Sequence, residues 1–343
     1  MGEFDLIRRF FTRPTPNAVL GVGDDCALLR SAPGMQMAIS TDMLVAGRHF
    51  FADTGPHALG HKALAVNLSD LAACGARPLA FTLALALPHA DEAWLAPFAQ
   101  GLLALADAHG CELIGGDTTR GPLTICITVF GEVPARGANP AAPTSALLRS
   151  GAQAGDDIYV SGTLGDAALA LRALQGTLEL PSDVLAAARA RLERPEPRVA
   201  LGQALRGVAS ACADVSDGLL GDLGHILERS GLGARVDVDR VLHLLAARTH
   251  FPGGAAQFDR QLGVAMAQQC VLAGGDDYEL VFCAAPAQRA AVAQASAHSA
   301  TPVTRIGSMQ AAPGLRLVDA LGHAVAPQFA SFDHFSAQRE GRA

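Results

Sequence analysis

The sequence predicts a mixed protein of the α+β class that is divided into two domains. The chain has 343 residues, and this length favours two domains over one or three. Strand-like and helix-like segments are mixed along it without the regular alternation of a doubly wound fold. A stretch rich in Pro, Gly and Ala, residues 134–146, separates the two halves and is the best linker candidate.

The first half is expected to hold three helices and four strands, from hydrophobic periodicity and from residues that begin or end helices. Asp91 can cap the second long helix, and Gly110 ends it. The expected helices cover residues 3–12, 57–73 and 91–109. The expected strands cover residues 37–41, where the strand ends at Asp42, and residues 79–87, 111–114 and 123–133.

The second half repeats the mixture of strands and helices. Gly231 and Gly233 stop a helix that follows the acidic segment at residues 214–218. One expected helix begins at residue 165, and two others cover residues 195–206 and 219–229. The expected strands cover residues 157–161, 211–215, 278–283, 304–306 and 315–318.

Composition excludes several classes of function. The formal net charge is −7 and no basic run is present, so a nucleic-acid partner is not expected. The longest apolar stretch, residues 79–87, is too short to cross a bilayer, and the N-terminus has no signal-peptide core. The seven cysteines form no C-x-x-C pair, which is typical of reduced thiols. We therefore expect a cytoplasmic protein without a membrane partner.

Aspartates recur beside glycine or serine in six short segments. Glycine allows tight turns and close approach to a ligand, and aspartate is a short, hard oxygen ligand for divalent cations. Clustered carboxylates repel one another by about 4 kcal/mol per close pair at an effective dielectric near 20. Such a cluster needs cations, and a site with several cations is typical of polyphosphate chemistry. The segments are residues 21–25, 40–42, 67–70, 114–117, 214–218 and 273–277.

Several of these segments also have an ordinary structural interpretation. Residues 21–25 can be a simple turn, residues 40–42 a helix cap, and residues 114–121 a tight hairpin. The common phosphate-binding motifs are absent, because the chain has neither a Walker A loop nor a protein-kinase motif set. The joint occurrence of six acidic segments, in a chain with only 17% charged residues, favours function over six unrelated turns.

Nine segments, in this order, resemble the thiamine-monophosphate kinase family. They are residues 2–7, 21–29, 39–50, 62–78, 113–121, 149–156, 214–219, 274–280 and 332–335. The resemblance implies a PurM-like fold with an N-terminal α/β domain that forms a homodimer and an α+β C-terminal domain. The implied limits are 1–138 and 149–343, with a linker at about 134–148.

The resemblance also assigns site residues by motif. It implies several Mg²⁺ ions, with ATP and thiamine monophosphate as substrates, and Asp42, Asp70 and Asp117 as the most critical residues. The implied metal ligands are Asp25, Ser40, Thr41, Asp42, Asp70, Asp117, Asp214 and Asp217. The implied ATP contacts are Gly116, Asp117, Arg149 and Ser216, and the implied substrate contacts are His49, Asp276 and Phe329.

Two positions stand out from the family pattern or from the composition. The family usually has Glu where this chain has Asp276, so we expect the shorter side chain to reach substrate through water. Lys62 is the single lysine among 26 lysine and arginine residues. Chance, surface exposure and a need for a compact ammonium group all remain open for Lys62.

The resemblance implies direct in-line transfer of the γ-phosphoryl group of ATP to thiamine monophosphate, the last step of thiamine diphosphate synthesis. No general base is expected, because the acceptor phosphate is itself largely dianionic at neutral pH. Two alternatives remain open. One is another ATP-dependent enzyme of the superfamily that includes aminoimidazole ribonucleotide synthetase and selenophosphate synthetase. The other is a non-catalytic protein that senses nucleotide or metal.

Overall fold

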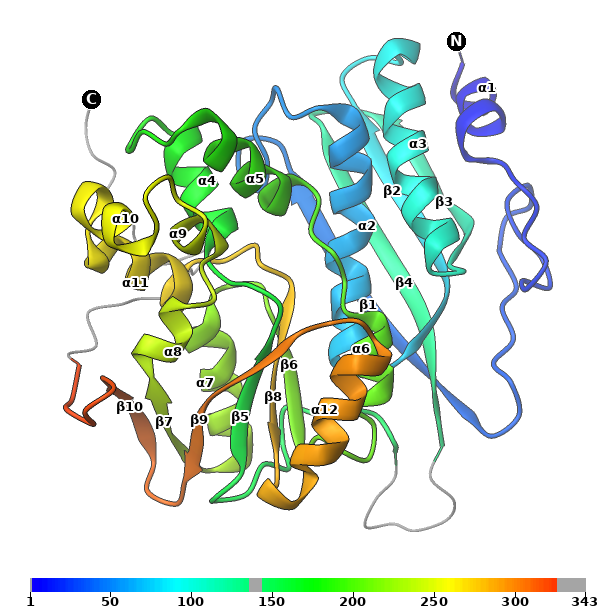
Figure 1. Ribbon diagram of the computed structural model, residues 1–343. Coiled ribbons are helices and arrows are strands. Elements are labelled where there is room, and N and C mark those ends of the chain that lie inside the picture. The colour runs from blue at the N-terminus through cyan, green and yellow to red at the C-terminus, as the bar shows by residue number, and fades with distance from the viewer. Residues whose placement is uncertain (1, 136–143, 326–343) are drawn as a thin grey trace.

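The computed structural model describes residues 2–135 and 144–325, and their strands form two separate sheets (Figure 1). Helices accompany both sheets, which confirms the predicted mixture of α and β structure. The first sheet uses strands before residue 135, and the second uses strands after residue 156. The predicted domain limits stay a prediction, and the predicted linker lies partly outside the described residues.

The N-terminal part has one four-stranded sheet with strand order β1-β4-β2-β3, in which only β2 and β3 run parallel. Its elements are α1 (Glu3–Leu6), the π-helix η1 (Ile7–Phe11), β1 (Met35–Val45), α2 (Pro56–Ala73), β2 (Arg77–Leu87), α3 (Glu92–Ala108), β3 (Glu112–Arg120) and β4 (Thr124–Pro134).

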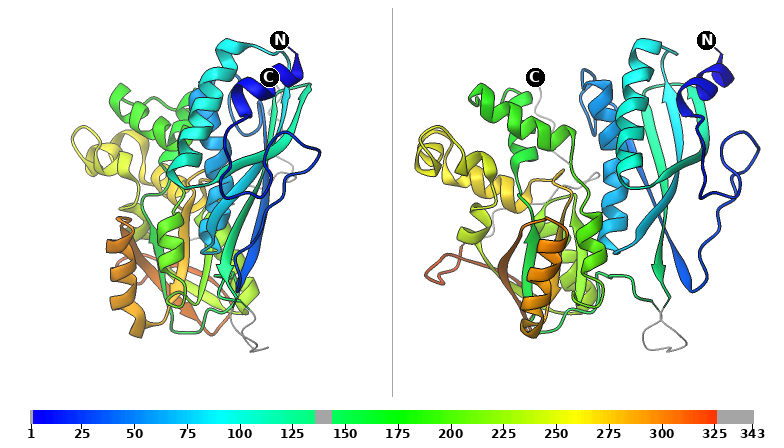
Figure 2. Two further views of the ribbon diagram at one scale, coloured as in Figure 1. Left: turned by 90° about the vertical axis from the view of Figure 1, so that its right-hand side faces the viewer. Right: turned by 45° about the vertical axis from the view of Figure 1, so that its right-hand side comes forward.

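One face of this sheet is covered by α2 and α3, and Figure 2 shows the other face turned away from the C-terminal part. Leu83, Ile127 and Val129 point to the helices and join the main core cluster. On the other face, residues of the segment before β1 pack against Leu79 and Ile114. Strand alternation therefore gives this sheet one helix-covered face and one outer face.

Helix α2 is the central element of the molecule. It touches α3 and β1 on the N-terminal side and α6 and β6 on the C-terminal side. Thirteen of its residues are buried, which is typical of a helix that is apolar on all sides. Glycines allow close packing with α3: a Cβ at Gly101 would lie 1.9 Å from the carbonyl oxygen of His57.

The C-terminal part has a six-stranded sheet with the order β10-β7-β9-β5-β8-β6. Its strands are β5 (Asp157–Ser161), β6 (Ala211–Val215), β7 (Gly233–Asp237), β8 (Glu279–Ala284), β9 (Val303–Gln310) and β10 (Gly314–Val318). Its helices are α4 (Asp166–Leu174), α5 (Ser182–Glu193), α6 (Val199–Ala204), α7 (Leu219–Ser230), α8 (Val238–Leu242), α9 (Ala246–Thr249), α10 (Ala255–Leu262), α11 (Val264–Ala273), the 3₁₀ helix η2 (Pro286–Gln288) and α12 (Arg289–His298).

Most predicted elements are present, and the clearest differences concern strand ends. The strand predicted at 37–41 does not end at Asp42, because β1 pairs with β4 as far as Val45. The strand predicted at 111–114 continues to Arg120, because the following residues pair with β2 in parallel. Asp42 and Asp117 therefore lie within strands, and the hairpin interpretation of residues 114–121 is wrong.

Other differences concern the second half. The helix predicted at 195–206 is reduced to α6, and α5 was not predicted. The strand β7 and the helices α8 to α12 were also missed. Gly231 does end α7, with a left-handed backbone (φ 67°), as predicted.

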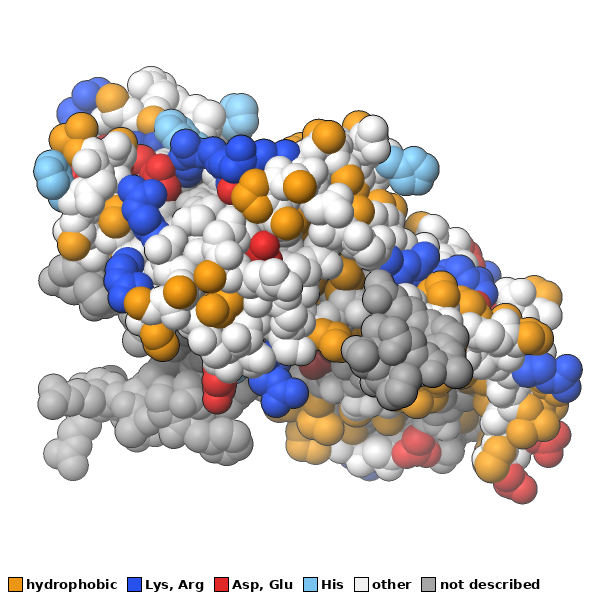
Figure 3. Space-filling model, turned by 90° about the horizontal axis from the view of Figure 1, so that it is seen from below, with side chains coloured by type: hydrophobic (Ala, Val, Ile, Leu, Met, Phe, Trp, Pro, Cys, Tyr) orange, Lys and Arg blue, Asp and Glu red, His pale blue; other side chains and the backbone are white. Residues whose placement is uncertain are grey.

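Two findings concern the surface and possible membrane segments. Among residues 2–135 and 144–325, no helix is both long enough and apolar enough to cross a membrane. On the face shown in Figure 3, the basic side chains of the described residues form separate groups among acidic and apolar ones. A continuous basic surface is thus missing from the described part of this face.

Candidate active site

Carboxylates from both parts of the chain meet beside α2. Asp42 comes from β1, Asp70 from α2 and Asp214 from β6, and Asp217 follows β6. The charges of Asp70 and Asp217 both act on Asp42, and those of Asp70 and Asp42 act on Asp214. We refer to Asp42, Asp70, Asp214 and Asp217 as the carboxylate cluster.

Polar residues of α2 fix the cluster in place. The backbone N–H of Asp42 donates to Asn67 Oδ1 at 3.0 Å, and Asn67 Nδ2 donates to the carbonyl oxygen of Ala63 at 3.0 Å. The hydroxyl of Ser40 donates to Asp70. Ser69 Oγ donates to Asp214 Oδ2 at 2.8 Å, so this bond joins the two parts of the molecule.

Burial raises the pKa values of Asp42, Asp70 and Asp214, and neighbouring negative charges add to the shift at Asp42 and Asp214. Burial, followed by the charges of Asp70 and Asp217, raises the pKa of Asp42 to about 6. Burial, followed by the charge of Asp70, raises the pKa of Asp214 to about 8. Burial also raises the pKa of Asp70, although the Ser40 hydrogen bond and the charge of Arg149 oppose that shift. The cluster is thus partly desolvated, and without a cation its carboxylates resist being ionised together.

Asp222 is a site residue that the sequence analysis missed. It lies in the first turn of α7 and accepts hydrogen bonds from the backbone N–H groups of Ser216 (3.0 Å) and Asp217 (3.1 Å). Burial, followed by the charge of Asp217, raises the pKa of Asp222 to about 7. Its carboxylate shapes the loop that carries Ser216 and Asp217. The signal available in the sequence was an acidic residue in the first turn of a predicted helix.

Two predicted ATP contacts lie next to the carboxylate cluster. The charge of Arg149 acts on both Asp70 and Asp222. Ser216 follows β6 directly, and its carbonyl oxygen accepts a hydrogen bond from the backbone N–H of Asp276 at 2.9 Å. A guanidinium group beside buried carboxylates is the group expected to bind phosphate oxygens once cations are present.

Gly116 and Asp117 do not join the cluster within one chain. Across the sheet, Asp42 pairs with Ile127, Ile127 with Leu83, and Leu83 with Gly116. Three strand spacings place Asp117 about 14 Å from Asp42. The side chains also lie on opposite faces, because Asp42 is in register with Ile127 of the helix-covered face and Asp117 with Ala84 of the outer face.

Thr41 and Asp25 also lie apart from the helix-covered face. The Thr41 hydroxyl bonds the Thr128 hydroxyl across β1 and β4 at 2.8 Å, on the outer face. Asp25 lies in an exposed loop before β1. Phe329 lies outside the described residues.

A cavity of about 110 Å³ between the two parts holds the remaining predicted substrate contacts. His49 and Asp276 both line it, together with Lys62 of α2 and side chains of α4 and α5. His49 Nδ1 accepts a hydrogen bond from the backbone N–H of Val45 at 3.0 Å, which orients the imidazole ring. Phe50 and Phe51 provide an aromatic wall. The cavity is small, and its lining combines aromatic and charged side chains.

Lys62 is buried, so surface exposure does not explain the single lysine. Its side chain is 4% exposed, and Nζ lies 2.9 Å from Asp276 Oδ1. The hydroxyl of Tyr278 donates to the same oxygen at 3.1 Å. Asp276 and Tyr278 both have left-handed backbone conformations (φ 66° and 52°), which are strained for residues other than glycine.

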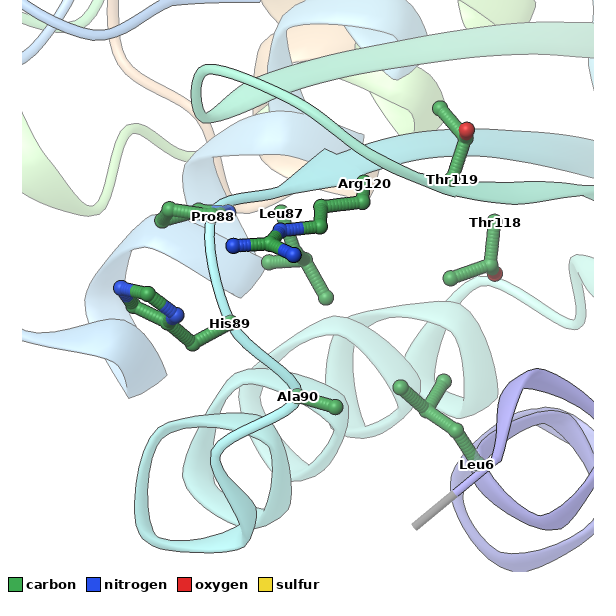
Figure 4. Close-up of a pocket in the computed structure, with 8 residues that line it drawn as sticks. All are labelled: Leu6, Leu87, Pro88, His89, Ala90, Thr118, Thr119 and Arg120. Atoms are coloured by element: carbon green, nitrogen blue, oxygen red, sulfur yellow. The ribbon is translucent and has the colours of Figure 1, made fainter.

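A larger cavity, of about 420 Å³, lies at the C-terminal ends of β2 and β3 (Figure 4). Leu6, Pro88, His89 and Arg120 are among its lining residues. No carboxylate lines it among the described residues. It lacks the acidic side chains that the predicted chemistry requires, so we place the candidate site at the carboxylate cluster and the smaller cavity.

The donor set at the cluster fits Mg²⁺. Its members are carboxylate and hydroxyl oxygens, which are hard ligands. Among the described residues, no group of three or more acidic, histidine or cysteine side chains forms a ready-made metal cage. Mg²⁺ usually binds to one or two carboxylates, water and substrate phosphates, so an open arrangement of this kind suits ions that arrive with a nucleotide.

Family models match most of the chain. One, described as AIR synthase related protein, N-terminal domain, matches residues 23–133, and another, its C-terminal domain, matches residues 153–320. The thiamine-monophosphate kinase of Salmonella typhimurium is 45% identical over 340 residues, with 98% of each chain covered. The chain belongs to the thiamine-monophosphate kinase family. The Escherichia coli K12 kinase is also 45% identical, over 343 residues.

Solved structures agree with this family and with the predicted PurM-like fold. The thiamine-monophosphate kinase of Stenotrophomonas maltophilia K279a has a TM-score of 0.78 and 45% identity, and the match covers 94% of this chain and 96% of that one. AaThiL, complexed with AMPPCP and TMP, has a TM-score of 0.72 and 26% identity over 89% of each chain. Hydrogenase maturation protein HypE, at 20% identity and a TM-score of 0.71, shares the fold.

Proposed function

We propose that this member of the thiamine-monophosphate kinase family phosphorylates thiamine monophosphate with ATP and releases thiamine diphosphate and ADP. The observation that carries the proposal is the carboxylate cluster beside a small aromatic cavity, both built around α2. Relatives that carry this activity in their names match 98% of the chain, and a neighbouring structure binds AMPPCP and TMP.

The chemistry is a single in-line displacement. A phosphate oxygen of the acceptor attacks the γ-phosphorus of ATP, a new P–O bond forms, and the bond from the γ-phosphorus to the β,γ-bridging oxygen breaks with its electron pair going to ADP. The acceptor phosphate is already largely dianionic at neutral pH, so no proton need be removed. Catalysis then depends on positioning two polyanions and on balancing their charge.

The residues divide this work according to their positions. Asp42, Asp70, Asp214 and Asp217, with Ser40, would hold Mg²⁺ ions that arrive with ATP, whereas the Thr41 side chain lies on the opposite face of the sheet. When bound, Mg²⁺ neutralises the charge on the phosphoryl oxygens. Arg149 and Ser216 lie beside the cluster and would bind the phosphates, while His49 and Asp276 line the cavity and would orient the acceptor. Asp25 would bind one of these Mg²⁺ ions from its exposed loop.

We propose a homodimer, because one chain leaves the site incomplete. Asp117 lies about 14 Å from Asp42 and on the opposite face of the sheet, so both cannot bind one Mg²⁺ ion within a chain. The outer face also exposes apolar side chains: Ile39 is 62% and Met43 54% exposed. If two outer faces pack together, the partner's Asp117 and Gly116 can reach the edge strand β1 and its cluster.

The cytoplasm is the location that we propose for the enzyme. All seven cysteines are free thiols, and four of them are buried: Cys111, Cys212, Cys270 and Cys283. This usage fits a reducing compartment.

An acceptor panel tests the proposed reaction. ADP release would first be measured with ATP and Mg²⁺ alone. Thiamine, thiamine monophosphate or the substrate of aminoimidazole ribonucleotide synthetase would then be added in separate reactions. We expect release that depends on thiamine monophosphate, with a product whose mass is that of thiamine diphosphate. ADP release with another superfamily substrate, or nucleotide binding without turnover, would instead support one of the alternatives.

A further inference from the structure

We propose that Lys62 is a positioning residue that sets the affinity for the acceptor by holding Asp276 in the cavity; this inference rests on the proposed function. Lys62 provides a buried positive charge on α2, and Asp276 provides the carboxylate that faces it. The lysine acts through Asp276 and takes no part in the transfer itself.

The burial of the pair shows which side of Asp276 is available. The Lys62 side chain is 4% exposed, whereas that of Asp276 is 29% exposed and lines the cavity. Lys62 Nζ and the Tyr278 hydroxyl both bond Oδ1 of Asp276. The protein thus binds one carboxylate oxygen of Asp276, while the side chain remains partly exposed to the cavity. Oδ2 is then the oxygen that we expect to meet the acceptor.

The segment that carries Asp276 is held in a strained conformation. The backbone N–H of Asp276 donates to the carbonyl oxygen of Ser216 at 2.9 Å, and that of Tyr278 donates to Val215 at 2.9 Å. These bonds keep both residues at positive φ. Left-handed backbone at two non-glycine residues costs free energy, and such strain persists where the surroundings fix a functional side chain.

Helix geometry separates Lys62 from Asp70 of the carboxylate cluster. Lys62 and Asp70 lie eight residues apart on α2, which is about 12 Å along the helix axis. The acceptor's phosphate must lie at the cluster, where the phosphoryl group is transferred. The Lys62–Asp276 pair therefore meets the other end of the acceptor, which in thiamine monophosphate is an aminopyrimidine ring. Its amino group is a hydrogen-bond donor, and a bridging water can connect it to the short Asp276 carboxylate.

The geometry of the two cations explains why lysine and not arginine occupies this position. Arginine is the usual cation of the chain, since Lys62 is the single lysine among 26 lysine and arginine residues. A guanidinium group is larger and planar, and prefers to bind both carboxylate oxygens at once. An arginine at position 62 would therefore compete with the acceptor for Asp276 Oδ2. A compact ammonium group can bind Oδ1 alone.

The test is a double-mutant cycle with Lys62→Met, Asp276→Asn and the double variant. We expect K62M to raise the KM for thiamine monophosphate at least roughly tenfold, with kcat and the KM for ATP within about twofold of wild type. Calorimetry should show the same loss in the Kd for thiamine monophosphate. In the D276N background, adding K62M should change the KM little further, because the lysine acts through the carboxylate.

Two further variants control for structure. Lys62→Arg keeps the charge and should raise the acceptor KM while kcat is kept; it carries the test if K62M does not fold. Arg248→Met breaks a similar half-buried ion pair with Asp259, between α9 and α10, and should leave the acceptor KM unchanged. Thermal unfolding of each variant reports whether the fold is intact.

The outcomes separate the inference from the proposed function. An inactive wild-type enzyme that also fails to bind thiamine monophosphate would contradict the proposed function. With an active wild type, additive effects of K62M and D276N on KM would overturn the inference alone. So would a K62M variant that loses kcat at unchanged KM, since Lys62 would then act on the transferred phosphoryl group.

Discussion

At the scale of single residues, the site is defined by carboxylates that are close together and partly out of water. Asp42 and Asp214 have raised pKa values because burial and neighbouring charges both disfavour ionisation. A bound cation offsets this cost of ionisation. The residues that destabilise the metal-free protein therefore stabilise it when Mg²⁺ binds. Charge, and not a general base, is what these residues contribute.

The raised pKa values predict how stability depends on pH. In the unfolded chain an aspartate has a pKa near 3.9, whereas Asp42 and Asp214 have values of about 6 and about 8 in the fold. The folded state thus binds more protons between about pH 4 and pH 8, and its free energy of unfolding falls as pH rises through that range. Denaturant unfolding in EDTA at pH 5.5 and pH 8 measures this.

Magnesium and a matched variant provide the control for the pH effect. Mg²⁺ should raise the unfolding midpoint more at pH 8 than at pH 5.5, because the ligands must be deprotonated to bind it. Asp214→Asn should flatten the upper part of the pH dependence. Equal stabilisation by Mg²⁺ at both pH values would mean that the cluster does not bind the ion.

Removing one carboxylate tests its part in turnover. Asp42→Asn or Asp70→Asn should lower kcat by roughly 10²-fold or more, because a carboxylate that holds the charge-neutralising Mg²⁺ is lost. Higher Mg²⁺ should restore part of the activity, and the fold should be kept. Asp319→Asn is a suitable control, since Asp319 is a surface residue paired with His323. Full activity in D42N or D70N would contradict the assignment.

At the scale of elements, β3 explains the glycine pair before Asp117. Gly116 has φ 145°, and a Cβ there would lie 1.9 Å from the carbonyl oxygen of Leu83 on the neighbouring strand. At Gly115 the nearest atom to a Cβ would be the Thr82 methyl group, at 3.8 Å. One glycine is required by the close approach of β2 and β3, and the other is not.

The two glycines therefore predict different effects of alanine. Gly116→Ala should destabilise the protein by about 1–3 kcal/mol or prevent folding, because both the backbone angle and the carbonyl contact are unfavourable. Gly115→Ala should be tolerated, with an effect within about 0.5 kcal/mol. Urea unfolding compares them. Equal effects would show that β2 and β3 are not packed as described.

Hydrophobic periodicity and helix-capping residues predicted the long helices and strands well. They did not predict where pairing with a neighbouring strand extends a strand. The helix at 57–73 and the Asp91 cap were predicted because periodicity and local chemistry decide them; Asp91 accepts a hydrogen bond from Ala93 N–H at 2.9 Å. By contrast, β1 and β3 continue through their aspartates because β4 and β2 pair with them. Such pairing has no local signal.

At the scale of the whole molecule, α2 links the two parts and carries residues of both the cluster and the cavity. Ser69 bonds Asp214 across the parts, and Lys62 pairs with Asp276 in the same way. The sequence could suggest that the acidic segments form one site, and four of the aspartates do meet. It could not show that Asp117 lies on the opposite face of the sheet, because that depends on strand order.

The separation of Asp42 and Asp117 predicts complementation between subunits. D42N and Asp117→Asn variants should each be nearly inactive as homodimers. If the partner's Asp117 completes the site, a mixture that exchanges subunits forms heterodimers with one intact site each. Random exchange makes half of the dimers heterodimers, so about a quarter of wild-type activity should return.

A variant at the outer face provides the control for this mixing experiment. Met43→Asp should prevent outer faces from packing together, and sedimentation should then show a monomer with little activity. No recovery after confirmed subunit exchange, or an active monomer, would show that each chain builds its site alone.

The transfer of a labelled γ-phosphoryl group tests the central claim most directly. The enzyme would be incubated with Mg²⁺, thiamine monophosphate and ATP labelled with ¹⁸O in the γ-phosphoryl group, and the products would be analysed by mass spectrometry. The account predicts that the label appears in the terminal phosphate of thiamine diphosphate, with one ADP formed for each diphosphate. Label found only in free phosphate, with thiamine monophosphate unchanged, would contradict it.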